Sequence, residues 1–224
     1  LVEDLTYAAA NLPEKRSAEV ARVTSIAAQA LLGKVHLTFG QPAAAEAVLA
    51  TAMENPDYGL MATTADAFDI NNKGAKNREF IFILYYNKSN DNGHGYWYSA
   101  STSVKADIQN PTAEFKAIYD TAKDNRYTLI DDYVPITGSV YAMKKWYDTY
   151  DATYTTQVGN DYPHLRYADV VLMYAEALAQ QGRVSDACTY LNKTRKRAGL
   201  DDFTTTDKTA FIKELAAERG REFA

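Results

Sequence analysis

The chain has 224 residues, enough for one sizeable domain, and its apolar fraction of 46% is ordinary for a globular protein. A net charge of −5 argues against a protein that binds the nucleic-acid backbone. The single cysteine, Cys188, excludes an intrachain disulfide and a multi-cysteine metal site, and we expect a packed thiol. No apolar run approaches the roughly 18 residues that cross a membrane.

The beginning of the chain predicts three helices. A short helix covers residues 3–12, and a long one runs from a cap at Ser17 to about Phe39, with apolar residues in periodic positions. The third begins at Pro42, a residue suited to the first turn of a helix, and ends at Glu54. These helices indicate a scaffold with one helical hairpin.

The middle of the chain changes character. The β-branched and aromatic run at 79–87 predicts a short strand, and Asn110-Pro111 precedes a further helix. The rest of residues 57–160 is polar, glycine-rich or aromatic and predicts loops with short strands. Loops of this length within a domain usually carry function or are mobile.

Residues 163–200 predict a second helical hairpin, joined at Gly182. Ser185 and Asp186 can cap its second helix. The basic run at 193–197 lies where a helix C-terminus favours cations, and we interpret it as a solvated helix end. A last helical pattern follows and continues to the final residue.

The two hairpins repeat each other when their turn glycines, Gly40 and Gly182, are aligned. Small residues then coincide where two helices must approach closely, and large ones fill the space between. This is the spacing of a tetratricopeptide repeat. The fold class that we predict is mainly α, with tetratricopeptide-like hairpins and a long insert of loops and short strands. The aligned pairs are Leu31 with Met173, Gly33 with Ala175, Ala45 with Ala187, and Leu49 with Leu191.

Ordered motifs run through most of the chain. The late ones are Arg166, Asp169, LMYAEAL at 172–178, Gly182, Ala187, Leu191-Asn192, Arg195 and RAGL at 197–200; the others are the helical pair around Gly40, NREFIFILYY, PTAEFKAIYDTAKDNR, Glu218-Arg219 and Glu222. In this order they resemble the SusD/RagB family, nutrient-binding outer-membrane lipoproteins of Bacteroidetes-type bacteria.

The resemblance implies a non-enzymatic, SusD-like protein on the extracellular face of the outer membrane. It would bind an oligosaccharide and deliver it to a SusC-like TonB-dependent transporter. Family members are about twice as long and carry an N-terminal lipidated cysteine, so we expect a fragment lacking both ends, with its lipid anchor outside. We divide it, within one structural domain, into an N-terminal helical scaffold (1–56), a loop-rich candidate ligand region (57–160), and a C-terminal hairpin with a truncated helix (161–224).

The sequence gives no reason to expect an enzyme. HExxH, GxSxG and P-loop patterns are absent from it, and no acidic pair is spaced in a way that selects a glycosidase centre. We therefore expect no catalytic residues, cofactor or metal. Residues 87–93 faintly resemble a calcium loop, but Tyr98 occupies the twelfth position, where an acid is needed.

Three polar residues in helices are interpreted as structural. Glu176 lies among alanine and leucine, so it must be paired or lie at a rim, because a buried lone carboxylate is costly. Asn192 is expected to bond to backbone, and His36 to be packed. The candidate partners for Glu176 are Arg166, Arg195 and Arg197.

The aromatic loops are the candidate ligand site. Sugars present flat C–H faces and hydroxyl edges, which suit aromatic planes beside polar groups. Many of these rings would instead pin loops to the helices, but two or three with polar neighbours could give micromolar to millimolar affinity. The alternative function is a tetratricopeptide-type adaptor that binds proteins. Such an adaptor would have at least three contiguous repeats, whereas the sequence shows two repeats that lie far apart. The ligand-binding residues that we predict are Asn92, His94, Tyr96, Trp97, Tyr98, Trp146 and Tyr147.

Overall fold

The computed structural model describes residues 1–14, 22–87, 94–95, 111–131, 133–137, 140–146, 148 and 157–224. The elements are α1 (Val2–Asn11), α2 (Ser25–Thr38), α3 (Pro42–Met53), α4 (Thr64–Phe68), η1 (Ile70–Asn72), η2 (Gly74–Lys76), β1 (Phe80–Leu84), β2 (His94–Gly95), α5 (Ala113–Lys116), α6 (Tyr127–Asp131), β3 (Tyr133–Thr137), β4 (Val140–Met143), η6 (Lys144–Trp146), β5 (Gln157–Val158), β6 (Tyr162–Arg166), α7 (Tyr167–Gln180), α8 (Val184–Arg197) and α9 (Lys208–Phe223).

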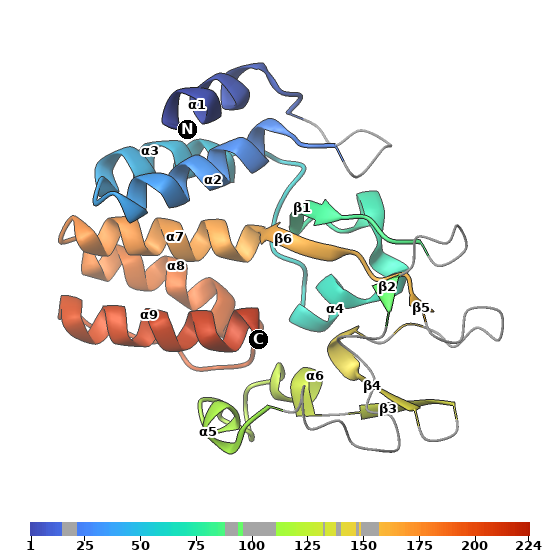
Figure 1. Ribbon diagram of the computed structural model, residues 1–224. Helices are drawn as coiled ribbons and strands as arrows, with labels where there is room; N and C mark the ends of the chain where they lie inside the picture. Colours follow the sequence, from blue (N-terminus) through green and yellow to red (C-terminus); the bar gives the residue numbers. More distant parts are fainter. Residues whose placement is uncertain are drawn as a thin grey trace.

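The long helices form a stack on one side of the molecule (Figure 1). Two hairpins, α2–α3 and α7–α8, pack side by side through α3 and α7, with α1 against α2 and α9 against α7 and α8. Gly40 and Gly182 form the two hairpin turns with φ of 68° and 84°, a conformation that favours glycine. The prediction of a mainly helical fold with two helical hairpins is confirmed.

The two helices of each hairpin meet at small residues in the expected places. A Cβ atom on Gly33 would lie 2.5 Å from Leu49, so α2 and α3 are in contact at this glycine. Ala45, Ala175 and Ala187 are fully buried. One aligned pair differs, because Met173 is buried whereas Leu31 is 38% exposed on the outer side of α2.

Two helix starts differ from prediction. Helix α2 begins at Ser25, not after a cap at Ser17, because Thr24 is extended and the Ser25 amide donates to the carbonyl of Pro13. Helix α8 begins at Val184 with Arg183 at its N-cap, and no side-chain cap bond from Ser185 or Asp186 is formed. The Arg183 side chain instead pairs with Glu46, across to the other hairpin.

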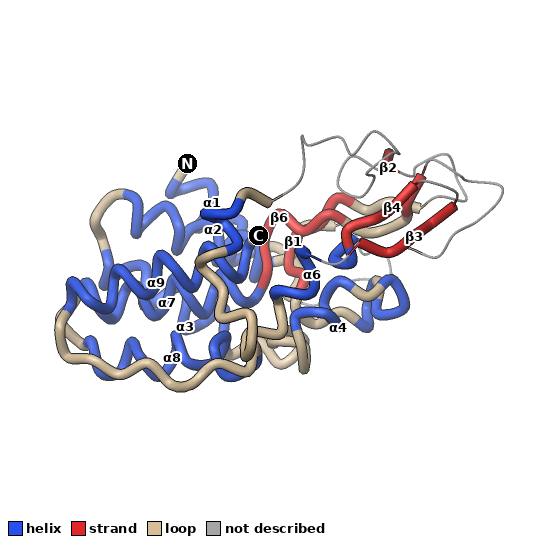
Figure 2. The backbone as a smooth tube through the Cα atoms, turned by 90° about the horizontal axis from the view of Figure 1, so that it is seen from below, coloured by secondary structure: helices blue, strands red, loops and turns tan. Residues whose placement is uncertain are grey.

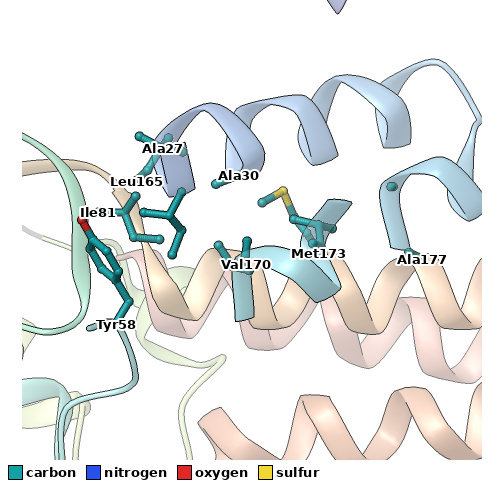
Figure 3. Packing of buried hydrophobic residues seen from close by; sticks show 12 residues of the cluster. Ala27, Ala30, Tyr58, Ile81, Leu165, Val170, Met173 and Ala177 are labelled. Atoms are coloured by element: carbon teal, nitrogen blue, oxygen red, sulfur yellow. The ribbon is translucent and has the colours of Figure 1, made fainter. Parts of the chain in front are cut away.

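The main hydrophobic core lies between the two hairpins and the first strand pair. Figure 3 shows Val170, Met173 and Ala177 of α7 beneath α2, with Ile81 and Leu165 of the strands at one end. A second cluster joins α7, α8 and α9, and buries the thiol of Cys188 as expected. The Asn192 side chain donates to the carbonyl of Phe203 and accepts from its amide, which confirms the predicted bonds to backbone. His36, expected to be packed, is only half-buried and forms a hydrogen bond with the side chain of Gln41.

The strands lie beyond one end of the helix stack (Figure 2). Within the described residues they form three antiparallel pairs, β1–β6, β2–β5 and β3–β4. The strand predicted at 79–87 is β1, and its pairing sets Phe80 opposite Arg166 and Leu84 opposite Tyr162. The helix predicted after Pro111 is the short α5. No helix in the described part of the chain is long and apolar enough to cross a membrane.

Candidate functional site

A buried network of charged side chains lies where the strands meet the helices. Arg166, at the start of α7, contacts Glu79 and Glu222, each at 3.0 Å, and Arg197 of α8 contacts the same two carboxylates. All four side chains are at most 5% exposed. The network therefore joins the strand β1 to the helices α7, α8 and α9.

A third arginine extends this network to the loop before α6. Arg126 contacts Asp124 at 2.7 Å, Glu218 at 2.8 Å and Glu222 at 2.9 Å, and it is 2% exposed. Burial alone would raise the pKa of Glu222, but Arg166, Arg197 and Arg126 outweigh it and lower the pKa to about 2. The arginines thus hold the buried carboxylate of Glu222 ionised.

This network corrects the interpretation of the basic run, and it decides between the two alternatives predicted for Glu176. Arg197 is not part of a solvated helix end, because it is buried and paired. Glu176 has no arginine partner among the described residues; it is half-buried at a rim and accepts a bond from Gln180. Arg166 and Arg197 bind other acids, and Arg195 pairs with Glu214. The arginines Arg166, Arg195 and Arg197 of the late motifs therefore belong to the scaffold.

A pocket of about 440 Å³ lies beside the network. One part of its wall is aromatic: Trp146 stacks on Tyr162 with ring centroids 5.9 Å apart and an angle of 14°. Trp146 also packs edge-on against Phe68, at 5.1 Å. Because Trp146 is only 9% exposed, most of its ring anchors η6 to the core, and only part faces the pocket.

Lys145 forms a second part of the pocket wall. It is 6% exposed, and its Nζ lies 4.4 Å from the ring centre of Phe68. No hydrogen bond or ion pair holds this amine within the described part of the chain. Burial and the nearby charge of Arg166 lower the pKa of Lys145 to about 7. This lysine is thus close to losing its charge at neutral pH.

Arg219 and Asp169 form a third part of the pocket wall. The Nη2 atom of Arg219 donates to Asp169 at 2.6 Å, from α9 to α7. Its Nη1 atom is buried and finds no partner among the described residues. The guanidinium lies over the ring of Phe223, at 5.2 Å. The pocket can therefore offer hydrogen-bond donors and positive charge beside aromatic rings.

The structure places two of the seven predicted ligand residues. Trp146 lies at the pocket, and the backbone of His94 is in β2, paired with Val158 four residues before Tyr162. The other five lie outside the described residues, as does most of the candidate calcium loop; they are Asn92, Tyr96, Trp97, Tyr98 and Tyr147. Among the described residues, no group of three or more acids, histidines or cysteines is arranged to hold a metal ion.

Sequence reasoning missed Lys145, Tyr162 and Arg219. Lys145 precedes a tryptophan in a lysine pair, a pattern that is usually solvated, and only its burial distinguishes it. Tyr162 lies directly before the late hairpin, and its partner Trp146 is apparent only from the packing. Arg219 belongs to the Glu218-Arg219 motif, but nothing in that motif indicates that its side chain lines a pocket.

Comparisons with known proteins agree with this architecture. The sequence profile of the SusD family matches residues 125–224. A SusD superfamily protein from Bacteroides vulgatus is 26% identical, with a TM-score of 0.78 over 99% of this chain and 53% of its own. A SusD-like protein from Bacteroides fragilis is 22% identical, with a TM-score of 0.80 over 100% of this chain and 56% of its own.

A third similar structure is surface glycan-binding protein A from Bacteroides uniformis. It is 19% identical, with a TM-score of 0.73 over 99% of this chain and 53% of its own. The chain spans about half the length of the solved structures that it matches. A comparison with curated proteins finds no match. The sequence of residues 125–224 matches the SusD family, and the fold of the whole chain is similar to that of SusD superfamily structures, as the sequence predicted.

Proposed function

We propose that this chain is part of a non-enzymatic glycan-binding protein of the bacterial cell surface. The observation that carries the proposal is the likeness of the whole fold to structures named surface glycan-binding protein A, from two Bacteroides species. A further similar structure is named a SusD-like carbohydrate binding protein. The described part of the chain supports this with a pocket that has aromatic and hydrogen-bonding walls, the combination that sugar recognition requires.

We place the ligand at the strand end of the molecule. The proposed binding residues are Asn92, His94, Tyr96, Trp97, Tyr98, Trp146 and Tyr147. Trp146 lies on the pocket wall, and β2–β5 pairing brings the chain at His94 toward the segment that leads into β6. The same proposal puts the protein on the extracellular face of the outer membrane, where it delivers its glycan to a SusC-like TonB-dependent transporter.

The test is a glycan array followed by calorimetry on the best ligand. Trp97→Ala is expected to weaken binding about tenfold or more, because one ring covered by a sugar contributes about 2 kcal/mol. Trp146→Ala is unsuitable, since removing a buried aromatic ring costs about 3–5 kcal/mol of stability. The matched control is Tyr7→Ala, an aromatic side chain that is 71% exposed on α1.

The outcome separates the proposal from its rivals. Failure of the protein to bind any glycan would contradict the proposed function. Equal effects of Trp97→Ala and Tyr7→Ala on affinity would show that the glycan does not bind at Trp97. Release of reducing sugar from a bound glycan would identify a hydrolase. Delivery is tested separately, by co-purification of the protein with a TonB-dependent transporter from outer membranes.

A further inference from the structure

The pocket beside Trp146 holds a buried amine that forms no ion pair with the described residues. Lys145 is the clearest case, because a buried ammonium group is costly without an acid beside it. Its Nζ has aromatic neighbours, at 4.4 Å from the centre of Phe68 and 5.6 Å from that of Trp146, and no carboxylate within 4 Å among the described residues. Ring faces stabilise a cation only partly, so the described residues leave this amine without an ionic partner.

A second donor belongs to Arg219, which lines the same pocket. Arg219 binds Asp169 through Nη2, while its buried Nη1 has no acceptor among the described residues. Arginine presents its donors in a planar fork that matches a carboxylate. A buried donor without an acceptor costs free energy, because it has lost its hydrogen bonds to water. An acceptor that reaches Nη1 would offset this cost.

The acids near the pocket are already engaged. Asp169 binds Arg219, and on the side of the network Glu79 and Glu222 are shared by Arg166 and Arg197. The other basic groups that line the pocket are Lys34 of α2 and His164 of β6, and both are exposed. Glu79 and Glu222 also act on Lys145 and raise its pKa, but both are already paired with arginines, and neither forms an ion pair with its amine.

We propose that this pocket is a subsite for an acidic sugar. A uronic acid unit would place its carboxylate at the ammonium of Lys145 and the Nη1 of Arg219, with its ring beside the Trp146–Tyr162 stack. This inference rests on the proposed glycan function and narrows it to glycans that contain a uronic acid. Lys145 and Arg219 are its specificity-determining residues.

The test compares two probes by calorimetry: a glucuronic acid-containing oligosaccharide, and the same oligosaccharide with its carboxyl group reduced to an alcohol. The acid is expected to bind about tenfold or more tightly than the reduced form, because charge-assisted hydrogen bonds are about twice as strong as neutral ones. Lys145→Met and Arg219→Gln should each remove most of this preference. Lys213→Met is the matched control, on the exposed side of α9.

A proton measurement distinguishes a direct role of Lys145 from a structural one. Its pKa of about 7 means that much of the amine is neutral at pH 7.5 and that a bound carboxylate would favour protonation. Binding of the acid should therefore take up protons at pH 7.5 and weaken from pH 6 to pH 8. Calorimetry in two buffers with different ionisation enthalpies measures this uptake, and Lys145→Met should abolish it.

Equal affinity for the acid and its reduced form would overturn the inference and leave the proposed function intact. Binding of neither probe, while a neutral glycan binds, overturns the inference alone; failure to bind any glycan removes both. A structure in which a polypeptide carboxylate lies between Lys145 and Arg219 would also overturn it. Thermal melts establish whether each variant folds. If Lys145→Met does not fold, the inference is tested by the acid preference of Arg219→Gln and by the proton uptake of the unchanged protein.

Discussion

At the scale of single residues, Arg126 is the most deeply buried arginine of the network. Three carboxylates surround its guanidinium, and the side chain is 2% exposed. Its removal would leave buried acids without a partner, which costs about 3–5 kcal/mol. We therefore expect Arg126→Met to lower the free energy of unfolding by that amount, measured in urea at pH 7.

The control for this prediction is a surface ion pair. Arg183 contacts Glu46 between the two hairpins, but its side chain is 42% exposed. Exposed pairs contribute about 0.2–1 kcal/mol, so Arg183→Ala should have a small effect. Equal effects of the two substitutions would show that the buried network does not stabilise the fold more than a surface pair does.

Glu222 makes the network sensitive to acid. Arginines lower the pKa of this buried carboxyl to about 2 in the folded protein, from an ordinary value of 4.5 in the unfolded chain. Its stabilising contribution is then complete above about pH 4.5 and is lost as the pH falls toward 2. This difference corresponds to roughly 3 kcal/mol.

We expect Glu222→Gln to destabilise the protein at pH 6 and to flatten the decline in stability between pH 5 and pH 2. Urea unfolding at a series of pH values measures this slope. Glu176→Gln is the comparison, because that glutamate is half-buried and makes no ion pair within the described residues. A Glu222→Gln protein whose slope equals that of the unchanged protein would contradict the assignment.

At the scale of elements, close contact at Gly33 joins α2 to α3. A methyl group there would meet Leu49, a fully buried side chain, at 2.5 Å. Overpacking costs about 1–3 kcal/mol, and the gain from replacing a helical glycine is at most about 1 kcal/mol. Gly33→Ala should therefore destabilise the protein by about 1–2 kcal/mol, measured by thermal or urea unfolding.

Gly220 of α9 is the matched glycine. A methyl group there would lie 3.3 Å from the end of the Ile118 side chain, which can shift, so Gly220→Ala should be neutral or slightly stabilising. If Gly33→Ala were equally harmless, the hairpin would not depend on a small residue at this contact, and the tetratricopeptide-like spacing would lose its physical basis.

The helices could be predicted from the sequence because their causes are local. Apolar periodicity and the turn glycines at Gly40 and Gly182 specify both hairpins. The predicted caps at Ser17 and Ser185 were wrong because contacts distant in the sequence decide those helix starts: Ser25 bonds to Pro13, and Arg183 reaches Glu46.

The candidate site could be predicted only in part. Aromatic composition indicated the insert, and Trp146 does line a pocket. The neighbours of Trp146 come from elsewhere in the chain: Tyr162 from β6 and Arg219 from α9. No local pattern relates such segments, and only tertiary packing brings them together. For the same reason, the motif arginines were expected near Glu176, whereas they converge on Glu79 and Glu222.

At the scale of the whole molecule, the network and the cores connect the strand end to the helices. Arg166 ends β6 and begins α7, and it binds Glu79 before β1 and Glu222 in α9. Phe68, Phe80 and Trp146 form a cluster directly beside it. Because these groups are shared, loss of the strand end would leave charges of the helical part unpaired, and the two parts should unfold together.

The two tryptophans of the sequence allow this to be measured. In a Trp97→Phe variant, fluorescence reports the surroundings of Trp146 at the strand end, while far-ultraviolet circular dichroism reports the helix stack. We expect the two urea transitions to superimpose, which is the mark of two-state unfolding. A fluorescence transition at lower urea would show that the strand end unfolds independently, so that the buried arginines do not couple it to the helices. If the two parts unfold together, adding Arg126→Met to the Trp97→Phe variant should shift both transitions to lower urea by the same amount. The reason is that the weakened network contacts both parts.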